Sequence, residues 1–214
     1  MQLKEKREKM ELFKKWSRVV VIDSLILLFV ASVVSVLFLL LPHSKIKISG
    51  IYLDTPRNIA DFALRDQNGR PFTKQQLKGH WTILFFGYTH CPMVCPTTFS
   101  ALNQVMTILR KQLPSSQLPQ IVFISIDPKN DTPPRLNHYI KAFNPDFIGL
   151  TGEGDKVTTL EKTSSYNTVK ITEPTAHNTD ILLLNPNAQI QAYFLFPHRA
   201  AIIANDYQMI VTGK

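Results

Sequence analysis

The feature that most constrains the fold is a pair of cysteines placed between a strand and a helix. Residues 82–86 form a continuous apolar run, typical of a strand that is buried on both faces. Cys91 and Cys95 follow it, separated by three residues, and apolar residues then recur at helical spacing up to Leu113. These are the chain's 2 cysteines in 214 residues. We therefore expect the two thiols to act together, in metal binding or in thiol–disulfide chemistry.

Strands and helices alternate along the rest of the chain. Strands are predicted over residues 81–87, 121–126 and 147–150, helices over 97–113, 132–143, 155–165 and 198–211, and hairpins over 61–73 and 181–194. Such alternation implies a mainly parallel sheet, to which the hairpins add antiparallel pairing. A dithiol at a strand-to-helix junction of this sheet is the arrangement of the thioredoxin fold. We predict an α/β, thioredoxin-like domain over residues 57–214.

The N-terminal part of the sequence indicates a membrane anchor. Residues 1–18 carry seven Lys or Arg against three Glu, and residues 19–41 are apolar except for Asp23 and three serines. At about 1.5 Å per residue, a helix of this length crosses a hydrocarbon core of about 30 Å. A cleaved signal peptide is the alternative, although its apolar region is usually only about 7–15 residues long. Residues 42–56 are interpreted as a linker.

The charge asymmetry predicts the orientation of this single-pass anchor. The positive-inside rule keeps residues 1–18 in the cytoplasm and sends the C-terminal domain to the other side. In a bacterium this is the inner membrane with the domain in the periplasm. The alternative is the mitochondrial inner membrane facing the intermembrane space. Glutamates interrupt the basic residues, and this favours the bacterial assignment over a transit peptide.

The net charge limits the classes of partner. The chain carries a formal charge of +8, of which +5 lies after residue 41. There is no stripe of Lys and Arg interleaved with aromatic residues, so nucleic acid is not an expected partner. A mildly basic surface suits anionic lipid or an acidic protein.

The spacing of the cysteines predicts their geometry. If Cys95 lies in the first helical turn and Cys91 just before it, their Cβ atoms lie roughly 5–6 Å apart. A modest adjustment then permits a disulfide, or lets two thiolates hold one metal ion. The N-terminus of a helix also favours the thiolate form. A passive disulfide is the alternative, but a bridge across so short a loop removes little chain entropy.

A third metal ligand would come from the 6 histidines. His90 adjoins Cys91, but neighbours in an extended segment point to opposite sides. His177 stands shortly before the strand at 181–184, and spacing alone leaves it one candidate among several. The ligands are too few for a closed structural zinc site. Two thiolates and one imidazole suit copper, and sulfur favours Cu(I) in particular.

These residues resemble the Sco/SenC family, the membrane-anchored copper proteins of cytochrome oxidase assembly. The resemblance rests on the block from Phe85 to Pro96, on Ser125–Pro128, on Asp131–Pro133 and on the segment around His177. It implies that Cys91, Cys95 and His177 bind copper, as Cu(I), Cu(II) or both. It further implies a separate copper donor protein, and cytochrome c oxidase subunit II as the acceptor.

Two residues depart from the family pattern. Met93 replaces the acidic residue usual between the cysteines, and Asn130 stands where the family often has Arg. The loss of the acid removes a negative charge that would oppose thiolate formation. Met93 is interpreted as an exposed or packing residue, and a soft contact to Cu(I) is the alternative.

Three functions compete at this point. The first is a metallochaperone that delivers copper to the binuclear copper site of subunit II. The second is a thiol–disulfide oxidoreductase in which Cys91 and Cys95 are catalytic and reduce the cysteines of the copper-accepting partner. A peroxidase is a weaker third. Copper binding requires His177 as a ligand, whereas dithiol exchange does not, so the sequence leaves open whether the chain is an enzyme.

Overall fold

The computed structural model describes residues 24, 26–36, 47–166 and 179–213. The chain divides into two compact units, residues 1–45 and 46–214. The described part of the first unit is helical and exposed. Within the described ranges, no helix is both long and apolar enough to cross a membrane. Residues 1–18, nearly half of the predicted anchor at 19–41, and His177 lie outside the described residues.

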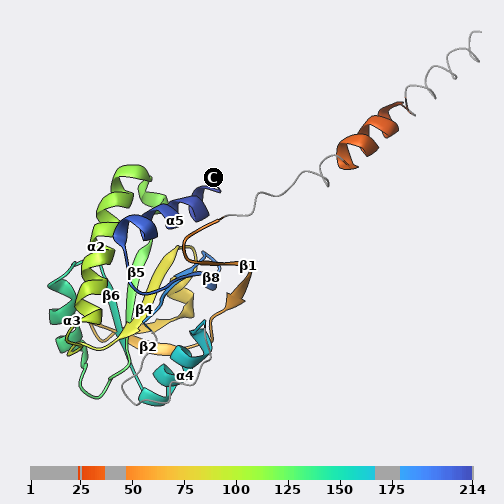
Figure 1. The fold of residues 1–214 in the computed structure, drawn as a ribbon. Helices are drawn as coiled ribbons and strands as arrows, with labels where there is room; N and C mark the ends of the chain where they lie inside the picture. The colour runs from red at the N-terminus through yellow and green to blue at the C-terminus, as the bar shows by residue number, and fades with distance from the viewer. Residues whose placement is uncertain (1–23, 25, 37–46, 167–178, 214) are drawn as a thin grey trace, which may run out of the picture. The chain divides into compact units, whose positions relative to one another are not determined.

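The second unit is built on one mixed sheet with helices on both faces (Figure 1). In the described residues its strands are β1 (Ile51–Asn58), β2 (Ala63–Asp66), β3 (Pro71–Thr73), β4 (Thr82–Gly87), β5 (Gln120–Ser125), β6 (Ile148–Thr151), β7 (Ile181–Leu184) and β8 (Gln189–Phe194). The helices are α2 (Val94–Gln112), α3 (Pro133–Lys141), α4 (Gly154–Ser164) and α5 (Ala200–Thr212), with short 3₁₀ turns at Lys74–Leu77 and Ser115–Gln117. The spatial order of the strands is β1-β8-β7-β4-β5-β6-β2-β3.

The centre of the sheet confirms the predicted parallel core, but the sheet as a whole is mixed. Strands β4, β5 and β6 run parallel, as expected for strands joined through helices. Every other pairing in the described sheet is antiparallel, including the contact of β7 with the central β4. The prediction of a mainly parallel sheet is therefore wrong outside the centre. The reason is that a returning hairpin pairs with β4 itself rather than at an outer edge.

Both predicted hairpins are present. In the first, β2 and β3 pair antiparallel around a turn in which Gly69 has a φ of +79°, a conformation that glycine adopts without strain. The Asp66 carboxylate closes this turn by accepting the N–H groups of Asn68 and Arg70. In the second, β7 pairs with β8. A tight turn depends on a few adjacent residues, so the sequence predicted both hairpins.

Strand β1 corrects the predicted boundary of the linker. Residues 51–56 were assigned to a linker, yet they form most of a strand that pairs antiparallel with β8. The pairing is interrupted by an irregularity between Tyr52 and Arg57, which breaks the alternation of apolar residues that usually signals a strand. The strand thus depends on an available edge of β8 rather than on its own sequence pattern.

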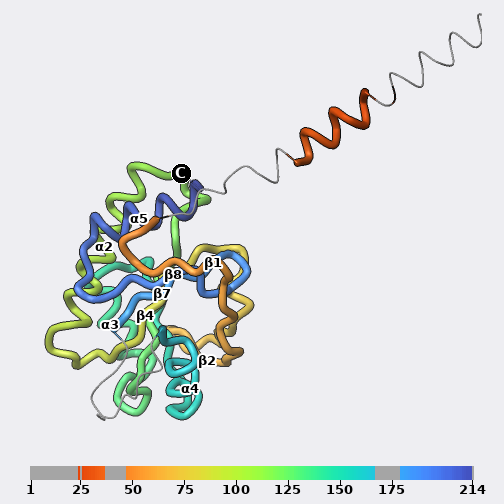
Figure 2. Tube along the Cα trace, turned by 45° about the vertical axis from the view of Figure 1, so that its right-hand side comes forward, coloured from red at the N-terminus to blue at the C-terminus, as the bar shows by residue number. Residues whose placement is uncertain are grey.

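Two apolar cores lie on the two faces of the sheet. Helices α2, α3 and α5 pack on one face, against Ile83, Phe85 and Phe123 among others. Helix α4 packs on the other face, against Leu84 and Phe86. Figure 2 shows α2 and α5 side by side, apart from α4. Strand β4 is buried along its whole length, as its continuous apolar run predicts. The dithiol turn, residues 88–95, therefore follows a strand that is buried along its whole length.

Candidate metal centre

The two cysteines lie at the N-terminus of α2, in the arrangement that their spacing predicts. The helix begins at Val94, so Cys91 precedes it and Cys95 lies in its first turn. Both are free thiols and both are buried. The side chain of Met93, the N-cap residue, makes no capping hydrogen bond. Instead the backbone N–H of Cys95 donates to the Cys91 sulfur, with 3.4 Å between N and Sγ. The Cys91 sulfur thus takes the place of a capping oxygen.

The two thiols have opposite electrostatic environments. Burial raises the pKa of Cys91, but the backbone N–H groups of Cys95 and Met93 lead the interactions that lower it, and the net result is a pKa below the ordinary value. Burial also raises the pKa of Cys95, and here it prevails over the opposing backbone N–H of Tyr88, giving a pKa of about 12. Cys91 is consequently the group that ionises first. The helix N-terminus stabilises its thiolate.

Gly87, the last residue of β4, makes room for the Cys95 sulfur. A Cβ atom placed on this glycine would lie 2.5 Å from Cys95 Sγ and 2.9 Å from the ring of Phe123. Neither neighbour can retreat easily, because both are buried in the core. The end of the strand must therefore carry a glycine for Cys95 to pack against it.

A buried carboxylate holds the turn that leads into the first cysteine. Asp131 has no exposed surface, and its carboxylate accepts the backbone N–H and the hydroxyl of Thr89 at 2.9 and 2.6 Å. It also accepts the hydroxyl of Ser125, at the end of β5, at 2.6 Å. The backbone N–H of Cys91 donates to the carbonyl of Tyr88, which closes the turn. The sequence does not predict this role for Asp131, because Thr89 lies 42 residues away.

His90, the neighbour of Cys91, contacts Asp127 and Tyr88. Its Nε2 lies 3.6 Å from a carboxylate oxygen of Asp127, and its ring lies 4.6 Å from that of Tyr88, centroid to centroid. In the described residues no group of three His, Cys, Asp or Glu side chains is arranged to hold a metal ion.

Two other histidines are exposed, and a third is packed against the cysteine helix. His80 and His138 lie on the surface. His198 places Nδ1 3.0 Å from the hydroxyl of Thr98, one turn beyond Cys95. Burial lowers the pKa of His198 to about 4, and the backbone groups of Phe194 and Thr179 oppose that shift. His198 thus lies near both the first turns of α2 and Thr179, where the described chain resumes.

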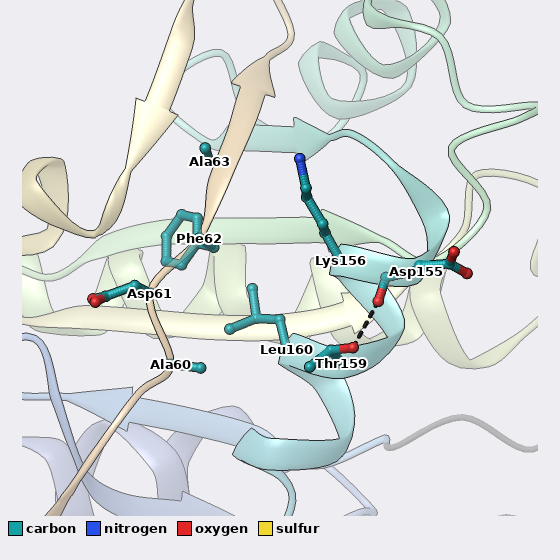
Figure 3. Close-up of a pocket in the computed structure, with 8 residues that line it drawn as sticks. All are labelled: Ala60, Asp61, Phe62, Ala63, Asp155, Lys156, Thr159 and Leu160. Atoms are coloured by element: carbon teal, nitrogen blue, oxygen red, sulfur yellow. Dashed lines mark hydrogen bonds between the residues drawn. The ribbon is translucent and has the colours of Figure 1, made fainter.

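A cavity of about 550 Å³ lies away from the cysteines, between α4 and the segment leading into β2 (Figure 3). Its walls include Phe62 and Leu160, which belong to the apolar core on the α4 face, whereas α2 packs on the other face. Among the described residues, no cysteine or histidine lines it.

This combination of sheet and dithiol turn corresponds to a known family over most of the chain. A family model described as SCO1/SenC matches residues 52–212. The chain belongs to the SCO1/SenC family. The resemblance seen in the sequence is thereby confirmed, and the matched region contains the dithiol turn and all the helices described in the second unit.

Relatives of the SCO1/SenC family occur in bacteria and in mitochondria. An SCO2-like protein of Rickettsia conorii is 45% identical over 107 residues, 50% of this chain and 51% of that protein. The mitochondrial SCO2 homolog of Danio rerio is 42% identical over 97 residues, 45% of this chain and 34% of that protein. The chain thus matches about half, or less, of the length of these relatives. The crystal structure of yeast Sco1 with copper bound superimposes with a TM-score of 0.64 at 26% identity, covering 74% of this chain and 91% of that one. The predicted thioredoxin-like fold is confirmed as the Sco form of it.

The residue that departs from the SCO1/SenC pattern between the cysteines points outward. Met93 is 71% exposed. The interpretation of Met93 as an exposed residue therefore agrees with the structure. An acidic side chain here would stand beside the thiol with the lowered pKa and oppose its ionisation. The neutral Met93 leaves that thiolate without a nearby like charge from this position.

Proposed function

We propose that this chain is a copper chaperone that binds copper through Cys91, Cys95 and His177 and delivers it to the binuclear copper site of cytochrome c oxidase subunit II. One observation carries the proposal: two free, buried thiols converge on the first turn of one helix, with Cys91 Sγ 3.4 Å from the N–H of Cys95. Copper bound to the related yeast Sco1 supports the choice of metal. Copper is the cargo, supplied by a separate donor protein.

The donor set suits copper in chemical terms. Thiolates are soft ligands that select Cu(I), and imidazole serves both oxidation states. Cys91 is ready to offer a thiolate, because its pKa is lowered. Cys95, with a pKa of about 12, loses its proton when the metal takes that proton's place. Loading therefore releases a proton from the buried thiol, and unloading returns one.

The proposed delivery depends on a membrane anchor. We assign residues 19–41 to a single span of the bacterial inner membrane, with residues 57–214 in the periplasm; the mitochondrial inner membrane, facing the intermembrane space, is the alternative. An anchor holds donor and acceptor at one surface, and this raises their effective concentration. Protease added to spheroplasts should digest the C-terminal domain. A C-terminal domain that is protected from protease in intact spheroplasts and digested only after lysis would contradict the proposed orientation.

A thiol–disulfide oxidoreductase is the second candidate, and the divergent pKa values of the two thiols favour it. The Cys91 thiolate would attack a disulfide of the copper-accepting partner, forming a mixed disulfide and releasing one partner thiolate. The Cys95 sulfur would then attack Cys91, while its proton passes to the second partner sulfur. The partner gains two electrons, and Cys91 and Cys95 become a disulfide. Regeneration needs an external dithiol reductant.

Replacement of His177 separates the two candidates. His177→Ala removes one of three proposed ligands and leaves the dithiol chemically intact. We expect Cu(I) affinity to fall by about 10–100-fold or more, while formation of the Cys91–Cys95 disulfide is retained. Oxidase assembly in cells should fail at limiting copper and recover partly when copper is added.

The matched control is His138→Ala, which removes an exposed imidazole from α3. It should change neither copper binding nor assembly. If His177→Ala assembled oxidase fully at low copper, the oxidoreductase would become the better account.

A further inference from the structure

A second surface stands out around α5 and the loop between β8 and that helix. Three large apolar side chains are exposed there: Leu195 at 46%, Phe196 at 52% and Ile202 at 38%. They border a hollow of about 270 Å³ that Gly50 and Ile203 also line. Exposed apolar side chains gathered at one place mark a surface that contacts another apolar phase. We call these side chains and Pro197 the α5 face.

The α5 face is uncharged apart from two cations at its border. Helix α5 carries one charged residue, Asp206, which is 1% exposed. Its carboxylate accepts the backbone N–H groups of Ser49 and Gly50, at 3.0 Å each. Arg199 lines the hollow, Lys47 lies two residues before Ser49 in the sequence, and both are exposed. The accessible charge beside the apolar side chains is therefore positive.

The chain enters the second unit at this same face. Asp206 fixes Ser49 and Gly50 against α5, so the entry point cannot move away from the helix without breaking two hydrogen bonds. Only five residues, 42–46, lie between the end of the apolar run at Leu41 and Lys47, so six Cα–Cα steps join the two. Six such steps reach at most about 20 Å when fully extended. If the apolar run spans a bilayer, the α5 face is held within that reach of the lipid surface.

We infer that the α5 face is a docking surface for an anionic lipid bilayer. Its apolar side chains enter the interfacial layer, and Lys47 and Arg199 meet lipid phosphates. The inference goes beyond copper delivery and involves neither cysteine, but it rests on the proposed anchor for the proximity of the membrane. An acidic protein would satisfy the two cations, yet it would not account for apolar side chains beside the chain's entry point.

The test uses the full, metal-free chain in nanodiscs whose lipids carry a nitroxide headgroup. Amide signals of residues 195–202 should broaden at least threefold more than those of the β2–β3 turn, because β3 and β1 lie at opposite edges of the sheet. The difference should be larger with phosphatidylglycerol than with phosphatidylcholine. Equal broadening at both places in both lipids would overturn the inference and leave an acidic protein as the occupant to consider.

A charge placed in the face provides the second arm. Ile202→Asp adds a negative charge in the first turn of α5, where a carboxylate favours the helix, and circular dichroism should show that the fold is retained. In this variant, the broadening of the amide signals of residues 195–202 should fall at least threefold. Asn68→Asp adds the same charge at the exposed turn of the far hairpin and should leave the α5 face unchanged. Undiminished broadening in Ile202→Asp would contradict the docking surface. Copper is absent throughout, so neither result depends on the metal proposal.

Discussion

Two buried carboxylates hold two different parts of this molecule. Asp131 and Asp206 are 0% and 1% exposed, and each accepts hydrogen bonds from the backbone of a segment far away in sequence. Asp131 binds the turn before Cys91 and also receives two hydroxyls, those of Thr89 and Ser125. Asp206 receives only backbone N–H groups, at Ser49 and Gly50.

One of these buried charges therefore supports the thiol chemistry, and the other holds the point where the chain enters the domain. Asp131 joins the ends of β4 and β5 directly beside the thiols, so a change there should disturb both stability and thiol reactivity. Asp206 fixes the place where the chain enters, at the α5 face. A change there should reduce stability and leave the thiols unaffected.

The largest effect is expected for Asp131→Ala. Three donors lose their acceptor in a buried site, and each unsatisfied group costs about 1–3 kcal/mol, reduced where a hydroxyl can rotate. We expect the free energy of unfolding, measured with urea, to fall by about 3 kcal/mol, and alkylation of Cys91 to change rate. Asp127→Ala is the control, because that side chain is partly exposed on the same loop. Equal losses for the two variants would remove the special role of Asp131.

Gly87→Ala should have the next largest effect. The added methyl group meets the Cys95 sulfur and the ring of Phe123, and overpacking of this kind costs about 1–3 kcal/mol. Disulfide formation between the cysteines, followed by mass spectrometry, should slow because Cys95 is displaced. At Gly154, the matched control, an added Cβ comes no closer than 3.9 Å to Pro128. An unaltered rate of disulfide formation in Gly87→Ala would show that the strand end tolerates a side chain.

Asp206→Asn should have a smaller and more selective effect. The amide keeps one oxygen that can accept, but it loses the charge that strengthens both hydrogen bonds, and we expect a loss of about 1–2 kcal/mol. Copper affinity and the alkylation of both cysteines should match the unaltered chain. A change in thiol reactivity would mean that the two regions are coupled. Asn205→Ala, on the exposed side of α5, controls for the helix itself.

The smallest expected effect is a difference in the pH dependence of alkylation between the two thiols of the unaltered, reduced chain. Cys91 has a lowered pKa, so its thiolate forms at a lower pH than that of an ordinary cysteine. Cys95, with a pKa of about 12, stays protonated across the neutral range. Alkylation read by peptide mass spectrometry should therefore label Cys91 first as the pH rises, and Cys95 only in strong alkali or after unfolding. Labelling of both with one pH profile would contradict the assigned environments.

Local patterns predicted most of the fold. The Asn68-Gly69 turn, the apolar strand β4 and the helix after the cysteines each carry their signal within a few residues, and all three are confirmed. Strand β1 and the antiparallel contact of β7 with β4 were missed, because each depends on an available strand edge formed by a distant segment. Pairing of this kind leaves little trace in a single sequence.

The candidate site likewise contains some residues that the sequence predicted and others that it did not. The positions of Cys91 and Cys95 followed from their spacing, whereas Gly87 and Asp131 did not. Asp131 binds Thr89 across 42 residues of sequence, and Gly87 matters only because the Cys95 sulfur packs on it. For Gly87, the one signal in the sequence was the position of this glycine at the end of an otherwise apolar strand, just before the cysteines. His177 lies outside the described residues, and its role as a ligand stays a prediction.

The most direct test of the central claim is Cu(I) titration of the reduced chain combined with X-ray absorption at the copper edge. We predict one copper per chain, bound by two sulfur atoms and one imidazole nitrogen. In His177→Ala the nitrogen contribution should disappear while both sulfurs remain, and His138→Ala should match the unaltered chain. A copper site with the same nitrogen contribution in folded His177→Ala, or no stoichiometric binding by the unaltered chain, would contradict the account.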